Sequence, residues 1–218
     1  RLMLIEPDLL TTGTRLVTFG LSSLVLAIAT ISAPWRTWLD DRERQWVWLA
    51  SLALLVAVWS MKAGITPGLS VRFLMVTALT LMHGWPLAVV GGAMVLAVLA
   101  LAGQSAWGSF GADLLCMAIV PAVVTARLHE LVHARLPHNY FVYFFVTVFV
   151  GSALAYNLAG LTRLALLAAS GSLAAARVGA EYFAVLPFMS FGEAAANGMV
   201  MAMAVVYRPK WVMSFDDR

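Results

Sequence analysis

The sequence predicts an all-α protein: a polytopic bundle of about seven transmembrane helices, with its N-terminus outside and its C-terminus in the cytoplasm. Hydrophobic residues make up 62% of the 218 residues, charged residues only 11%, and the mean hydropathy is +0.88. A soluble domain carries about 25% charged residues. The chain therefore cannot cover a water-facing surface, which excludes soluble enzymes, nucleic-acid binders and disordered tails as descriptions of the whole chain.

The apolar segments have the length of membrane helices, because a helix crosses the hydrocarbon core with about 20 residues. Short alternating segments of the kind that membrane strands need are not seen. The predicted spans are 16–33, 46–61, 69–83, 86–102, 114–128, 140–155 and 191–207. A further apolar stretch, 158–176, could extend the sixth helix, re-enter the membrane or form an eighth span. We favour seven spans in a single domain, 1–218.

The distribution of basic residues predicts the orientation. With seven spans, alternate loops place Arg36, Arg42, Arg44, Arg127, Arg135, Arg208, Lys210 and Arg218 on one side and Arg1, Arg15, Lys62, Arg163 and Arg177 on the other. Cytoplasmic loops carry the excess of Lys and Arg. The first group is therefore expected in the cytoplasm, and the tryptophans that flank residues 34–45 suit a membrane–water interface.

Polar side chains within the apolar spans are the candidate functional residues, because charges at membrane depth usually face the bundle interior or a cavity. They are Arg72, Asp113, Glu193 and Asn197. Glu193 and Asn197 are four residues apart and so share a helix face. Arg72 could pair with Asp113 or Glu193, or could extend to the interface.

The segment His129-Glu130-Leu131-Val132-His133 fits the H-E-x-x-H pattern, in which two histidines on one helix face bind zinc and the glutamate acts as base. An intramembrane zinc protease is therefore one alternative. A third zinc ligand is not evident, and Arg127 and Arg135 flank the motif, as expected of a solvated cytoplasmic loop. No phosphate-binding loop is present, so the chain is not itself an ATPase. We expect no enzyme activity.

The order of several short segments resembles the CbiM family, the cobalt/nickel substrate-capture subunits of energy-coupling-factor transporters, in particular a proteobacterial branch. The matching segments are M-L-I-E-P at 3–7, P-G-L-S-V-R at 67–72, G-A-D-L-L-C-M-A-I-V-P at 111–121, R-L-P-H-N-Y-F at 135–141, L-P at 186–187, G-E at 192–193, N-G-M at 197–199, V-V-Y-R-P-K-W at 205–211 and F-D-D at 215–217. The resemblance implies a seven-helix subunit of the bacterial inner membrane. A scaffold subunit and an ATPase pair would drive transport.

The resemblance also implies a divalent metal near the outer face, held by an N-terminal Met-His pair and by a histidine before the third helix. This sequence has Leu4 and Arg72 at the two histidine positions. Leucine has no ligating atom, and arginine remains protonated. We therefore expect no nickel or cobalt at the family's site, and the identity of any cofactor is open.

Two hypotheses remain besides the protease. In the first, the chain is a transporter subunit with a polar cavity that opens to the outer face near Glu6, Arg72 and Glu193. An anion or a metal bound elsewhere is then the cargo. In the second, the chain is a structural or accessory subunit of a larger membrane complex, and side chains fill that cavity. The partners are lipids and other membrane subunits in both, with no nucleic acid.

Overall fold

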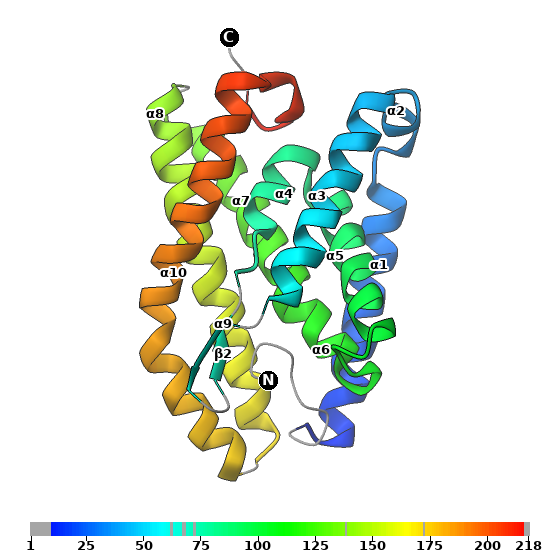
Figure 1. Cartoon of the computed structure of the whole chain (residues 1–218), viewed down its shortest axis with the longest axis vertical. Coiled ribbons are helices and arrows are strands. Elements are labelled where there is room, and N and C mark those ends of the chain that lie inside the picture. Colours follow the sequence, from blue (N-terminus) through cyan, green and yellow to red (C-terminus); the bar gives the residue numbers. More distant parts are fainter. Residues whose placement is uncertain are drawn as a thin grey trace.

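The computed structural model describes residues 10–61, 63–66, 69–71, 73–137, 139–171 and 173–215. In chain order the elements are α1 (Thr12–Ser32), α2 (Trp35–Leu39), α3 (Arg42–Ser60), β1 (Ala63–Thr66), β2 (Leu69–Val71), α4 (Val76–His83), α5 (Trp85–Leu101), α6 (Phe110–Leu114), α7 (Val120–Arg135), α8 (Tyr140–Val142), α9 (Gly151–Ala169) and α10 (Leu173–Tyr207). The helices pack side by side in one bundle (Figure 1). The predicted helical membrane bundle is thereby confirmed.

Two long helices are each built from more than one element. A π-helical stretch, Leu115–Ile119, joins α6 to α7, and another, Tyr143–Val150, joins α8 to α9. Within the described part of the chain, four stretches are long and apolar enough to cross a membrane by length and composition: Thr12–Ser32, Trp107–Arg135, Tyr140–Ala169 and Val185–Tyr207. The second of these is the central helix, because 72% of its most apolar window is buried, compared with 17% for α1.

The apolar stretch 158–176 is divided between two helices. Helix α9 continues without interruption to Ala169, and a short turn then leads into α10, which begins at Leu173. Gly171 occupies this turn with φ of +67°, a conformation that glycine adopts without steric cost. Most of the stretch therefore extends the sixth helix, and the rest begins a seventh helix far longer than predicted. Within the described residues this stretch therefore adds no separate eighth span.

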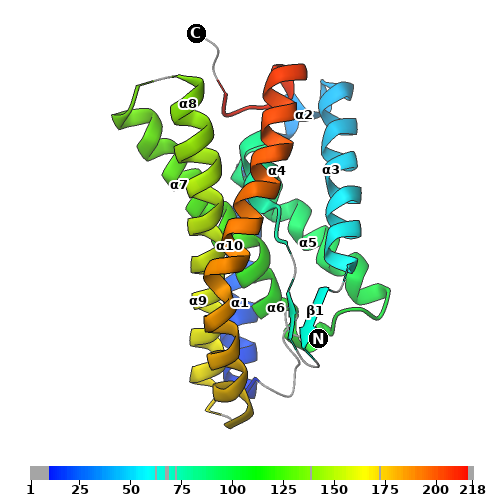
Figure 2. The ribbon, with the colours of Figure 1, turned by 60° about the vertical axis from the view of Figure 1, so that its left-hand side comes forward.

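The third predicted span differs from the structure. The segment 69–83 was expected to be helical throughout, but helix α4 begins only at Val76, and β2 pairs with β1 in an antiparallel hairpin before it. A helix of eight residues extends about 12 Å, against a hydrocarbon core of about 30 Å. In the sequence, Pro67-Gly68 is a turn signal between two runs that contain β-branched residues, and the hydropathy of the segment does not take account of it. Figure 2 shows the hairpin beside α10 and beyond the end of α3.

The basic loops gather at one end of the bundle, as the alternation of seven spans predicts. Helix α2, helix α8 and the C-terminal residues all lie at this end (Figures 1 and 2). The indole N–H of Trp211 donates to Glu43 Oε1 at 2.7 Å, and the hydroxyls of Tyr143 and Ser214 are 2.6 Å apart. These contacts bind the C-terminal residues to both α3 and the helix that begins at α8.

Candidate functional site

The start of α4 is an irregular backbone segment in the middle of the bundle. Residues 73–75 are not helical, and Met75 has φ of 54°, in the left-handed region that side chains rarely adopt. The N-cap residue of α4, Met75, makes no side-chain capping hydrogen bond. Irregular backbone at membrane depth is tolerated only where protein groups satisfy its N–H and C=O groups. The first N–H groups of this segment therefore need acceptors from another element.

Two side chains of α10 supply these acceptors. Glu193 Oε2 accepts a hydrogen bond from the N–H of Leu74, and Glu193 Oε1 accepts one from the N–H of Met75, each at 2.7 Å. One turn further along α10, Asn197 Oδ1 accepts from the N–H of Ala78 at 2.8 Å. A carboxylate is also favoured electrostatically at the N-terminus of a helix. We call Glu193 and Asn197 the α10 clamp.

The α10 clamp is buried and internally hydrogen-bonded. Glu193 is 2% exposed and Asn197 0%. Asn197 Nδ2 donates to Glu193 Oε1 at 2.8 Å and to the Glu193 carbonyl oxygen at 2.9 Å, so each member orients the other. On the opposite side, the indole N–H of Trp59 donates to the carbonyl oxygen of Leu74 at 3.1 Å. Leu74 is thereby fixed through both its N–H and its carbonyl oxygen.

A second buried polar group lies on the central helix. Asp113 is 0% exposed and accepts a hydrogen bond from the Ser109 hydroxyl at 2.9 Å. Arg163 of α9 is 4% exposed, and it lines a small cavity together with Leu74 and Cys116. The cavity therefore lies between Arg163 and the segment that the α10 clamp holds. Sequence reasoning counted Arg163 only as a loop charge, although a single arginine in an otherwise apolar stretch indicates a buried charge.

The structure brings together part of the predicted candidate set. Glu193 and Asn197 contact each other on one face of α10, as their spacing predicted, whereas Asp113 belongs to a separate helix. Both carboxylate oxygens of Glu193 already accept hydrogen bonds from backbone N–H groups. The remaining candidates, Glu6 and Arg72, and the replaced ligand position Leu4 lie outside the described residues.

The H-E-x-x-H segment occupies the last turns of α7. The ring centroids of His129 and His133 are 6.0 Å apart, and Glu130 pairs with Arg127 at 2.9 Å on the exposed face of the helix. A catalytic zinc site requires three protein ligands. Within the ranges that the structure describes, no group of three or more His, Cys, Asp and Glu side chains is placed to hold a metal ion. This geometry gives no support to the protease alternative.

Comparison with known proteins identifies the family. The family model of the cobalt uptake substrate-specific transmembrane region, CbiM, matches residues 5–211. The chain belongs to the CbiM family. It is thus an integral membrane subunit that resembles the substrate-binding component of a metal transporter, as the short segments of the sequence indicated.

Solved structures agree with this CbiM fold. A truncated transition metal transporter has a TM-score of 0.75 and 18% identity, over 93% of this chain and 98% of that one. A transition metal transporter has a TM-score of 0.74 and 18% identity, over 91% of each chain. No curated protein matches the chain. The likeness to the two structures concerns the fold alone.

Proposed function

We propose that this CbiM-family chain is the substrate-capture subunit of an energy-coupling-factor transporter in the bacterial cytoplasmic membrane, with its N-terminus outside. The observation that carries the proposal is the family match across residues 5–211. A scaffold membrane subunit and an ATPase pair would supply the energy, because the chain has no phosphate-binding loop of its own.

In this proposal the α10 clamp positions the residues before α4, which contact the cargo. The family's second histidine position is Arg72, two residues before Leu74, whose N–H is bound to Glu193. A loop that presents a ligand needs a fixed attachment, because small errors in geometry weaken binding. Glu193 and Asn197 are therefore positioning residues, and the side chains before Leu74 contact the cargo.

The cargo itself is held by groups other than the family's two histidines. Leu4 offers no ligating atom, and the guanidinium of Arg72 repels a cation while it favours an anion. An anion, or a metal that other groups bind, fits these replacements better than nickel or cobalt coordinated by imidazole.

Purification under mild conditions tests the assignment. We expect the chain to copurify with a scaffold subunit and with ATPase subunits, identified by mass spectrometry, and to contain no stoichiometric nickel or cobalt by elemental analysis. A stoichiometric unrelated membrane complex without ATPases would contradict transport and support the accessory-subunit alternative, which the replacements at Leu4 and Arg72 favour.

Restoring the family's two histidines tests the claim that their replacement prevents binding of nickel or cobalt. A chain that begins at Met3 and carries Leu4→His and Arg72→His should gain nickel or cobalt binding, measured by isothermal titration in detergent, because imidazole suits both metals. The matched control begins at Met3 and carries Leu4→His alone, and it should bind far more weakly. If the parent chain bound either metal as tightly as the double variant, the argument from the replaced ligands would be wrong.

A further inference from the structure

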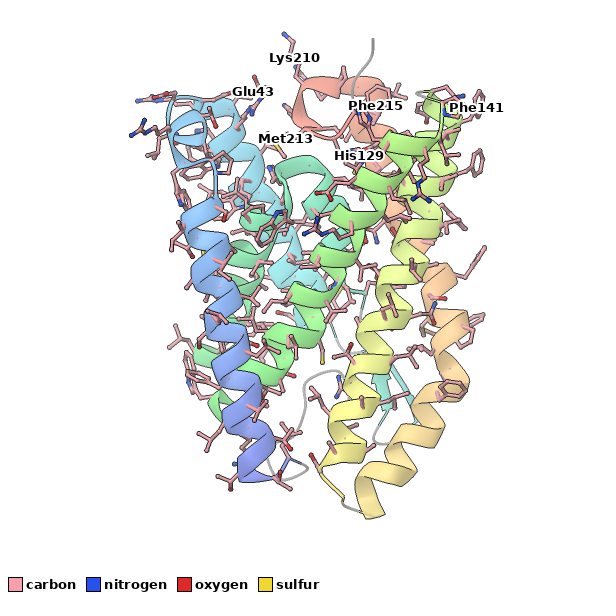
Figure 3. All side chains as sticks on the ribbon, turned by 180° about the vertical axis from the view of Figure 1, so that it is seen from behind. Glu43, His129, Phe141, Lys210, Met213 and Phe215 are labelled. Carbon is pink, nitrogen blue, oxygen red and sulfur yellow. The ribbon has the colours of Figure 1, made fainter. Side chains whose placement is uncertain are left out.

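A pocket opens at the end of the bundle where the C-terminal residues lie. Its walls come from α2, the start of α3, the corner between α4 and α5, and residues 210–213. Figure 3 places Glu43, Lys210 and Met213 together at this end. The pocket lies at the opposite end of α4 from the residues that the α10 clamp holds, and nothing in the proposed capture of cargo uses it.

Long-range contacts hold the walls of the pocket in place. The N–H of Met213 donates to the carbonyl oxygen of Met82 at 3.2 Å, and the indole of Trp211 is bound to Glu43. Gly84, at the α4–α5 corner, has φ of +85°, and a Cβ there would lie 2.7 Å from Met213 Cε. The C-terminal residues are therefore closely packed on this corner, and the pocket is a built part of the fold.

Two cations from distant parts of the sequence line the pocket. Lys210 has no ion-pair partner among the described residues, and Arg44, whose side chain is half exposed, pairs with Asp41 at 3.2 Å. Trp38 also lines the pocket, and its indole N–H lacks a hydrogen-bond partner in the described part of the chain. An ammonium and a guanidinium together recognise the oxygen atoms of a phosphate group.

Most of the remaining wall of the pocket is apolar, although Thr37 and His83 also line it. Val47, Met82, Leu87 and Met213 contribute hydrocarbon surface next to the two cations. Trp38 and Trp211 both line the pocket, and tryptophans are enriched at the membrane–water interface. A free phosphate ion would leave these apolar walls without a partner, whereas a phospholipid has a phosphate group joined to hydrocarbon chains.

We propose that this pocket binds an anionic phospholipid, with its phosphate group between Arg44 and Lys210 and its hydrocarbon portion against Val47, Met82 and Leu87. The basic loops place this end at the cytoplasmic leaflet, whose anionic lipids attract Lys and Arg side chains. The bound lipid joins the C-terminal residues to α2 and α3, and so stabilises the cytoplasmic end of the subunit.

Thermal unfolding of the full chain in detergent tests the proposal, with phosphatidylglycerol, phosphatidylcholine or inorganic phosphate added. Phosphatidylglycerol should raise the Tm, and the double variant Arg44→Gln/Lys210→Gln should need about tenfold more lipid for the same rise, because each cation contributes to the attraction. The matched control is Arg36→Gln/Arg42→Gln, which removes the same charge at the same end from side chains outside the pocket. The control should keep the response of the parent chain.

Native mass spectrometry provides a second readout that does not depend on stability. The parent and the control should retain bound phosphatidylglycerol, and the pocket variant should lose it. Equal retention by both double variants would overturn the proposal in favour of a general charge effect. If inorganic phosphate reproduced the rise in Tm, the assignment to a lipid would be overturned, although the phosphate chemistry of the pocket would stand. Both readouts are independent of transport, so failure here leaves the proposed function intact.

Discussion

Replacing Glu193 by alanine is expected to lower the free energy of unfolding by about 2–6 kcal/mol, because the N–H groups of Leu74 and Met75 would lose their acceptor in a buried site, at a cost of about 1–3 kcal/mol each. Thermal unfolding in detergent, followed by tryptophan fluorescence, measures the loss. Met199→Ala is the control, since Met199 lies on the same helix and is 68% exposed.

Glu193→Gln separates a positioning role from a ligand role. The amide retains one acceptor oxygen, but its NH₂ group would face a backbone N–H, so we expect a loss of stability between those of the parent and Glu193→Ala. Asn197→Ala should also be intermediate, because it removes one acceptor and one bond that orients Glu193. A Glu193→Gln protein with unchanged Tm but no cargo binding would contradict the clamp and make Glu193 a direct ligand.

The bundle was predictable from the sequence because composition and segment length follow directly from the membrane as solvent. The third segment was not predictable in the same way. Its hydropathy suits a span, but the chain departs from helix at residues 73–75, where acceptors on α10 satisfy backbone N–H groups that have no partner within α4. Glu193 is 119 residues from Leu74 in the sequence, and hydropathy does not report such partners.

The candidate site, like the fold, was predictable from the sequence only in part. The spacing of Glu193 and Asn197 predicted a shared helix face, and the structure confirms that they contact each other. The spacing could not indicate that both side chains bind backbone N–H groups of another element. Arg163 was missed as a candidate because the stretch 158–176 was uncertain, and its burial follows only once α9 is continuous to Ala169.

The second large loss of stability is expected where α1 packs closely against α6. A Cβ at Gly111 would lie 2.5 Å from Phe19 Cα and 2.7 Å from the Phe19 backbone nitrogen, so neither side-chain rotation nor a small shift can relieve the clash. The hydroxyl of Ser22 donates to the Gly111 carbonyl oxygen at 2.6 Å across the same contact. Small residues allow such close approach between membrane helices.

Gly111→Ala is therefore expected to separate α1 from α6 and to lower the free energy of unfolding by about 1–3 kcal/mol, the usual cost of overpacking. The gain in helix propensity, about 1 kcal/mol, offsets only part of this loss. Gly20→Ala is the matched control, because Gly20 lies within α1 and a Cβ there would meet no atom within 4 Å. Thermal unfolding should show a lower Tm for Gly111→Ala and an equal or higher Tm for Gly20→Ala. Equal shifts for the two variants would mean that α1 is not held by this contact.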